Sequence, residues 1–226
     1  MWQTFLIEPL TQLFLFLYNI LGQNMGLAIA ALTLILRLVL LPLSIPAIKA
    51  AVKQKDLAPK LAKLKEQYGS DKTGYAKAQM GLMKKEGLNP LSGCLPQILQ
   101  VVVLFALYRV FIDTLGKDNI NTGFLYLDLG LPDQYFILPI LAAAGQLIAS
   151  KIMMPAVQRG EAVAKATDDN KDDLAYNMQK QSLYLFPLMT LVVGYKLPSG
   201  LVLYWFLSTV FSAAQQVILQ KIYGKK

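Results

Sequence analysis

The chain has 226 residues, of which 55% are hydrophobic and only 16% are charged, and its formal net charge is +8. Soluble domains carry about a quarter charged residues and somewhat under half apolar ones, so this composition indicates a membrane protein with basic loops. The chain has no histidine and a single cysteine, Cys94. These counts exclude a disulfide within one chain, a His/Cys metal site and a histidine-based catalytic triad, and we expect neither enzyme activity nor a cofactor.

Residues 1–24 are predicted to form an amphipathic helix that lies in the membrane interface. Their unbroken apolar run, residues 13–20, is too short to cross a hydrocarbon core. A cleaved signal peptide is the alternative interpretation, but the first Lys or Arg is Arg37, so the segment lacks a basic start. One helix face is expected to carry Thr4, Glu8, Thr11, Gln12 and Asn19, and the other Phe5, Leu6, Leu10, Leu13, Phe14 and Leu17.

Five apolar stretches predict membrane spans, because a hydrocarbon core needs about 20 apolar residues to be crossed by a helix. Four are long enough or nearly so, at residues 26–45, 91–112, 135–154 and 200–222. The fifth, residues 182–197, is shorter and ends at Pro198-Ser199-Gly200, a triplet that predicts a tight turn between antiparallel spans. The expected fold is an all-α integral membrane protein with five transmembrane helices, at 25–48, 90–112, 135–155, 181–197 and 199–222.

The basic residues predict the orientation of these spans. Ten lysines lie between the first two spans and five basic residues between the third and fourth, whereas the other connections hold few. By the positive-inside rule, the N-terminus lies outside and the C-terminus in the cytoplasm. Residues 113–134 are then an extracytoplasmic loop, residues 156–180 a cytoplasmic loop and residues 223–226 a cytoplasmic tail.

Residues 49–89 are predicted to form a cytoplasmic helical hairpin, because apolar residues recur at helical spacing in two runs. The lysines on this hairpin are either a solvated face or a docking surface for clients and partners, and the sequence favours neither. The apolar stripes are Leu57, Leu61, Leu64 and Tyr68 in the first helix and Ala76, Met80 and Met83 in the second. The candidate docking residues are Lys53, Lys60, Lys63, Lys77, Lys84 and Lys85.

Arg37 lies in the middle of the first apolar stretch, where a charged side chain costs about 2.5 to 3.5 kcal/mol on insertion scales. The stretch continues for ~12 Å of helix beyond it, so the side chain reaches the interface only in part. None of the five stretches contains an Asp or Glu that would pair with it. We favour a water-filled cavity within the bilayer over the alternative, a structural arginine bonded to backbone carbonyls, and expect water, Gln146 and Ser208 to hold its charge.

Other polar and aromatic residues of the stretches are candidates to line this cavity. Their alternative role is hydrogen bonding between helices, worth about 0.6 kcal/mol each, which we favour for Gln215 and Gln216 but not for Gln146. For Tyr204 and Trp205 the alternative is an aromatic belt at the membrane surface. The candidate cavity residues are Arg37, Gln97, Gln100, Gln146, Tyr204, Trp205, Ser208 and Thr209.

Four features in series resemble the YidC/Oxa/Albino family of membrane-protein insertases, in a short YidC-like form. They are Arg37 followed by Leu41-Pro42-Leu43, the lysine-rich hairpin, the segment NPLSGCLPQILQ at 89–100, and the segment LPSGLVLYW at 197–205. Their order and spacing match over nearly the whole chain. Thr209 departs from the pattern, since members commonly have asparagine there.

The resemblance implies a groove that opens to the cytoplasm and to lipid and is sealed on the outer side, in a protein of the bacterial plasma membrane. The family's groove arginine falls on Arg37, and its polar and aromatic groove residues fall on Gln146 and Trp205. Such a groove shortens the barrier that a client's polar flank must cross, and Arg37 attracts acidic flanks. The implied partners are nascent membrane proteins, the Sec translocon, ribosomes, the signal-recognition machinery and membrane lipids. No specific nucleic acid is implied, and the expected functional unit is a monomer.

Four other functions compete with this hypothesis. A small-solute transporter with proton coupling needs an intramembrane Asp, Glu or His, and an anion channel built on one arginine per chain needs an oligomer. A Ser/Lys protease would have to use Ser199 and Lys196, which lie in the outer turn. An assembly factor without insertase activity is the fourth alternative.

Overall fold

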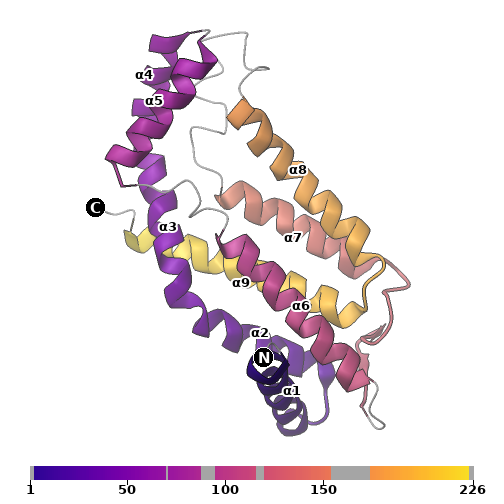
Figure 1. Ribbon diagram of the computed structural model, residues 1–226. Helices are drawn as coiled ribbons and strands as arrows, with labels where there is room; N and C mark the ends of the chain where they lie inside the picture. The colour runs from indigo at the N-terminus through magenta and orange to yellow at the C-terminus, as the bar shows by residue number, and fades with distance from the viewer. Residues whose placement is uncertain (1–2, 70, 88–94, 116–119, 154–173, 224–226) are drawn as a thin grey trace.

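The computed structural model describes residues 3–69, 71–87, 95–115, 120–153 and 174–223. Within these residues the chain is helical apart from one small β-hairpin, as Figure 1 shows, in agreement with the expected helical class. The strands of this hairpin are β1 (Gly123–Phe124) and β2 (Leu127–Asp128). The helices are η1 (Gln3–Ile7, a π-helical turn), α1 (Glu8–Ile20), α2 (Met25–Val39), α3 (Leu41–Asp56), α4 (Ala58–Tyr68), α5 (Lys72–Lys85), α6 (Leu95–Leu115), α7 (Ile137–Met153), α8 (Leu174–Gly194) and α9 (Ser199–Tyr223).

Length and composition allow some of these helices to cross a membrane. In the described part of the chain, residues Ile98–Leu115 of α6 and the whole of α9 are long and apolar enough. The α2 helix and the segment Leu41–Ala50 of α3 pass together as one bent unit, which raises the number of candidate spans to three. The apolar segments Ile137–Ile152 of α7 and Leu183–Gly194 of α8 are shorter. The number of five spans therefore stays a prediction.

The first predicted span, residues 25–48, is not one straight helix. The α2 helix ends at Val39, and α3 continues from Leu41 at an angle of 61°. Pro42 accounts for the break, because it has no N–H to donate to the carbonyl of Leu38 and disfavours a helical conformation in the residue before it. In the first turn of α3 the missing N–H of Pro42 loses no hydrogen bond within that helix, because the first N–H groups of a helix have no partner in it. The break places the bend just beyond Arg37.

The α9 helix is the centre of the packing, because four other helices contact it. It contacts α2, α3, α6 and α7, and α7 in turn packs on α8. The start of α9 is hydrogen-bonded to the loop before α7, with Ser199 N–H donating to the carbonyl of Leu131 at 2.8 Å and Gly200 N–H to that of Leu129 at 3.0 Å. A Cβ at Gly200 would lie 2.9 Å from Phe111, so glycine permits this close approach.

The α1 helix has three faces, where two were expected. Its buried face packs on α2 and α6, and Phe14 lies 5.7 Å from Phe111 of α6, centroid to centroid. Part of the predicted membrane face is therefore packed on protein. A second apolar stripe lies beside the polar face, and its side chains are 59–78% exposed. The predicted apolar face includes only Phe5 of this stripe. The buried face carries Leu10, Phe14 and Leu17, the polar face Glu8, Gln12 and Asn19, and the exposed apolar stripe Phe16 and Ile20 together with Phe5 of η1.

The α4 and α5 helices lie side by side at the end of α3 that is remote from α2 (Figure 1). Leu57 and Leu61 are buried there, packed against Ala50 of α3 and against Leu82 and Met83 of α5. Glycines with positive φ, Gly69 and Gly87, follow the two helices. The predicted apolar stripes of these two helices contain residues that are not buried, since the side chains of Tyr68 and Met80 are 38% and 53% exposed.

The loop between α6 and α7 contains structure that the sequence analysis did not predict. Its two strands pair antiparallel, with Gly123 opposite Asp128. Asp133 is buried and accepts hydrogen bonds from the Leu138 N–H at 2.8 Å, the Tyr135 N–H at 3.0 Å and the Tyr126 hydroxyl at 3.2 Å. Its carboxylate satisfies donors at the start of α7 that would otherwise lack partners.

Candidate functional site

Arg37 lies in the last turn of α2, where its side chain reaches both α6 and α9. Its Nε donates to the Oγ of Ser208 on α9 at 3.1 Å. Its Nη2 donates to the same oxygen at 2.5 Å and to Oε1 of Gln100 on α6 at 2.8 Å. Among the described residues, no carboxylate lies within ion-pair distance of Arg37. Neutral side chains, and not the backbone carbonyls of the alternative hypothesis, therefore hold the guanidinium, which keeps an uncompensated positive charge.

Gln100 connects the arginine to Tyr204. Its Oε1 also accepts from Ser208 Oγ at 2.9 Å, and its Nε2 donates to the Tyr204 hydroxyl at 3.2 Å. Because a guanidinium has donors only, the amide must present its oxygen to Arg37, and this requirement determines its orientation. We call these four residues, Arg37, Gln100, Tyr204 and Ser208, the Arg37 cluster. It joins three helices that are far apart in the sequence.

A small cavity lies beside the Arg37 cluster. The volume in which the centre of a water molecule fits is about 20 Å³. The cavity therefore has room for one water and not for a peptide segment. The cavity combines the polar side chains of the cluster with apolar side chains of α2 and α6. Its wall consists of Thr33, Leu36, Arg37, Leu40, Ser44, Leu99, Gln100, Val103, Tyr204 and Ser208. The wider groove that the resemblance implies stays a prediction.

Gln146 belongs to a different contact. The Oγ1 of Thr209 lies 3.3 Å from Oε1 of Gln146 and 2.9 Å from the carbonyl oxygen of Trp205. We expected Gln146 to help hold the charge of Arg37, but Gln100 has that position. The physical reason is the packing, since α7 lies against α8 and α9, whereas α6 lies against α9 and α3. The structure thus divides the candidate residues into the Arg37 cluster and a second group, Gln146, Trp205 and Thr209.

The remaining polar candidates have simpler positions. The side chain of Gln97 and the whole of Cys94 lie outside the described residues. Gln216 is 3% exposed and Gln215 is half-buried on α9. Burial agrees with the helix-packing role that we favoured for Gln216, because a buried amide needs partners within the protein.

Ser199 and Lys196 do not resemble a catalytic pair. The Ser199 hydroxyl is fully buried and donates to the carbonyl of Leu131 at 2.5 Å, so it stabilises the turn before α9. Lys196 is exposed. A serine nucleophile needs its hydroxyl within reach of a base and open to substrate, and Ser199 offers neither. Among the described residues, no group of three or more His, Cys, Asp or Glu side chains could hold a metal ion.

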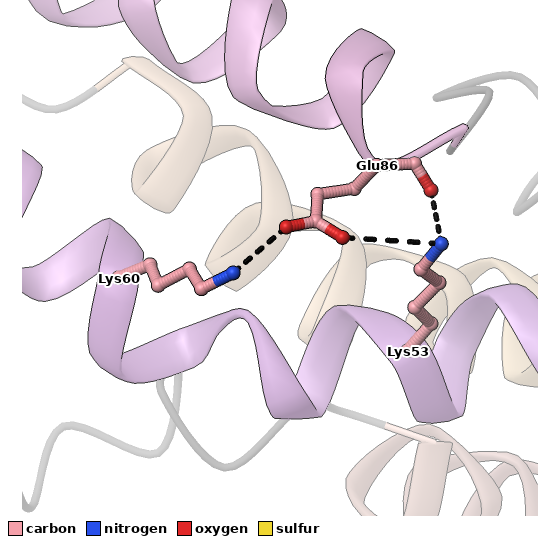
Figure 2. Close-up of polar contacts among 3 residues, drawn as sticks. All are labelled: Lys53, Lys60 and Glu86. Atoms are coloured by element: carbon pink, nitrogen blue, oxygen red, sulfur yellow. Dashed lines mark hydrogen bonds and ion pairs between the residues drawn. The ribbon is translucent and has the colours of Figure 1, made fainter.

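The lysines of α3, α4 and α5 differ in what they contact. Figure 2 shows two of them, Lys53 and Lys60, which both contact Glu86. Lys60 Nζ donates to Oε1 of Glu86 at 2.8 Å. Lys53 Nζ lies 3.9 Å from Oε2 of the same carboxylate and also donates to the backbone carbonyl of Glu86. Two of the six candidate docking lysines are therefore ion-paired at the end of α5. The other four, Lys63, Lys77, Lys84 and Lys85, are exposed.

We expect the packing of α5 on α3 and α4 to weaken in acid. The hydrogen bond from Lys60, followed by the charges of Lys60 and Lys53, lowers the pKa of Glu86 in the folded chain. A carboxyl group with a lowered folded pKa stabilises the fold above its unfolded pKa, and this contribution is lost as the pH falls through the folded value. Amide-exchange protection in α5 should therefore fall at low pH in the wild type and already be lower at neutral pH in Glu86→Gln. The control is Glu66→Gln on α4, and equal protection in all three proteins at neutral pH would contradict this expectation.

The fold and the site together define a helical integral membrane protein with an arginine held between three of its helices by neutral side chains. Comparison with known proteins gives the family. The model of the family described as "60Kd inner membrane protein" matches residues 16–226. The chain belongs to this family, and the resemblance to the YidC/Oxa/Albino insertases is confirmed.

Three relatives indicate how much of the chain is shared. The chain is 36% identical to Membrane protein insertase YidC 2 of Bacillus anthracis, over 97% of this chain and 81% of the relative. It is 32% identical to Membrane protein insertase YidC of Fusobacterium nucleatum, over 96% of this chain and 98% of the relative. The match to Membrane protein insertase YidC of Campylobacter jejuni, at 34% identity, covers 100% of this chain but only 39% of that relative.

Proposed function

We propose that this chain is a membrane protein insertase, which moves short hydrophilic flanks of client proteins across the membrane and releases their spans into lipid. The observation that carries the proposal is the positive charge of Arg37: among the described residues its side chain donates to neutral side chains only, and no carboxylate lies within ion-pair distance. The match to relatives named membrane protein insertase over nearly the whole chain supports it. Such transfer needs no covalent step and no nucleotide.

The proposed mechanism lowers the cost of moving a polar flank through hydrocarbon. A carboxylate at the centre of a bilayer costs about 2.5 to 3.5 kcal/mol on insertion scales. A fixed cation beside a small water-sized cavity attracts that carboxylate and replaces part of its lost hydration. We propose that a hydrated groove extends from the Arg37 cluster and opens to lipid for the client's apolar part. Its proposed lining is Arg37, Gln97, Gln100, Gln146, Tyr204, Trp205, Ser208 and Thr209.

We further propose five spans, formed by α2 with the start of α3, and by α6, α7, α8 and α9, in the bacterial plasma membrane with the N-terminus outside. One contact supports the predicted sidedness. Lys49 of α3 lies over the ring of Tyr223 at the end of α9, 4.8 Å from its centroid, so the α4–α5 pair and the end of α9 share one side.

The expected outcome of a labelling experiment checks this orientation. In a Cys94→Ser background, single cysteines at Lys63 or Lys77 should react only with reagents that reach the cytoplasm, because their exposed side chains lie in the lysine-rich pair. A cysteine at Asn121 should react from outside. Labelling in the reverse pattern would overturn the proposed topology.

Reconstitution in liposomes tests the function itself. Insertase activity predicts that a single-span client with a short translocated tail becomes protected from added protease only in vesicles that contain the chain. Solute flux without such protection would instead indicate a transporter. The same assay, with Lys63, Lys77, Lys84 and Lys85 replaced by glutamine, tests the proposed docking of clients, ribosomes, the signal-recognition machinery or the Sec translocon on α4 and α5. Unchanged client crosslinking would favour the solvated-face interpretation.

A further inference from the structure

Among the described residues, one nitrogen of the Arg37 guanidinium has no hydrogen-bond partner. Arginine has five N–H donors, one on Nε and two on each Nη. Nε and Nη2 make three hydrogen bonds, to Ser208 and Gln100. Nη1 makes no hydrogen bond to any of the residues that the structure describes. The cavity beside the cluster is therefore next to an arginine with its donors only partly used.

The occupied donors restrict how a carboxylate can bind. A guanidinium holds a carboxylate most tightly through two parallel N–H···O bonds, made either by Nε with Nη2 or by Nη1 with Nη2. Ser208 occupies the first pair, because its oxygen accepts from both Nε and Nη2. Gln100 accepts from Nη2 and so occupies half of the second pair. A carboxylate that approaches Arg37 can then bind through Nη1 alone.

We propose that Gln100 sets how tightly Arg37 holds a client carboxylate, by keeping the contact to one nitrogen. This inference rests on the proposed insertase function. Gln100 acts through Arg37 and is a positioning residue. Its amide is itself held by Tyr204, which is 3% exposed and accepts from Nε2, and by Ser208, which is 1% exposed. An acidic flank is thus attracted to the cluster without being trapped there, as a protein that must release every client requires.

The test uses the full chain in liposomes and two single-span clients that differ only in an Asp-Asp or Asn-Asn pair in the translocated flank. The quantity measured is the dwell time of the client, followed as decay of its crosslink to the chain after a chase. In Gln100→Leu, the N–H of Nη2 that Gln100 accepted is released beside Nη1. The carboxylate can then bind both nitrogens, so the dwell time of the Asp client should rise about tenfold, the effect of roughly 1.4 kcal/mol from one added charge-assisted bond. The dwell time of the Asn client should not change.

A second substitution at the same position should have the opposite effect. In Gln100→Glu, the new carboxylate pairs with Arg37 within the protein, so the Asp client should dwell no longer than the Asn client. The matched controls are Gln215→Leu and Gln215→Glu, on a half-buried glutamine of α9 outside the Arg37 cluster, which should leave both dwell times unchanged.

The outcomes separate this inference from the proposed function. If the wild type holds the Asp client longer than the Asn client, but Gln100→Leu shortens the Asp dwell time or changes both clients equally, the role of Gln100 is overturned and that of Arg37 stands. If the wild type holds both clients equally long, the proposed attraction by Arg37 fails, and the inference fails with it.

Discussion

Replacing Arg37 by alanine is expected to lower the insertion of clients with acidic flanks by roughly tenfold or more, since a hydrogen bond to a charged group is worth about 1.5 to 3 kcal/mol. Clients with neutral flanks should be affected least, because they gain little from the positive charge. Protease protection of the translocated flank, measured in reconstituted vesicles with matched clients, checks both expectations.

Arg37→Lys distinguishes the charge from the hydrogen-bond geometry. Lysine keeps the positive charge but cannot reproduce the three bonds that Nε and Nη2 make to Ser208 and Gln100. We expect this variant to retain most of the insertion of acidic clients. If both variants instead lower the midpoint of thermal unfolding and impair all clients alike, Arg37 is a structural residue and the proposed mechanism is wrong.

Phe14→Ala is expected to cost about 3 to 5 kcal/mol of stability, the usual range for truncating a buried phenylalanine. The ring of Phe14 is 1% exposed and packs against Phe111, so the substitution leaves a cavity between α1 and α6. Denaturant unfolding in mixed micelles measures the loss. The result matters for the fold because it tests whether α1 packs on protein through this face.

Phe16→Ala is the matched control on the same helix. Its ring is 60% exposed, so truncation removes contact with the surrounding lipid or detergent and leaves no internal cavity. The stability should change by no more than about 0.5 kcal/mol. Equal losses for the two variants would mean that α1 does not pack on the protein as described, and would return Phe14 to the membrane face that the sequence predicted.

The helical class, the helix pair at α4 and α5 and the turn before α9 could be predicted because each depends on neighbours in the chain. Gly69 and Gly87 follow helix ends through their positive φ, and Pro198 lies in the turn between α8 and α9, whereas Ser199 and Gly200 of the predicted turn lie inside α9. The bend at Pro42 had the same kind of local signal, since proline removes one helical hydrogen bond. The predicted span at residues 25–48 contains Pro42 without a break, whereas the structure bends by 61° there.

The Arg37 cluster could be predicted only in part. The five stretches contain no Asp or Glu, and in the described residues neutral side chains hold Arg37. Helical spacing placed Tyr204 and Ser208 on one stripe, and these two residues do share the cluster. Sequence spacing says nothing about which helix faces another, however, so Gln100 and Gln146 were equivalent candidates until α6 and α7 had been placed around α9.

The sequence by itself determined the membrane class and the helical class, and it showed that the apolar stretches hold no carboxylate to pair with the charge of Arg37, because composition and local periodicity carry that information. Only the tertiary structure decided which neutral side chains hold that charge and which donor remains available, since Arg37 and Ser208 are separated by 171 positions in the chain. The same holds for α1, whose apolar residues divide between protein and the exposed surface according to where α2 and α6 lie. Local patterns specify which residues avoid water. Packing specifies whether each of these residues contacts protein or lipid instead of water.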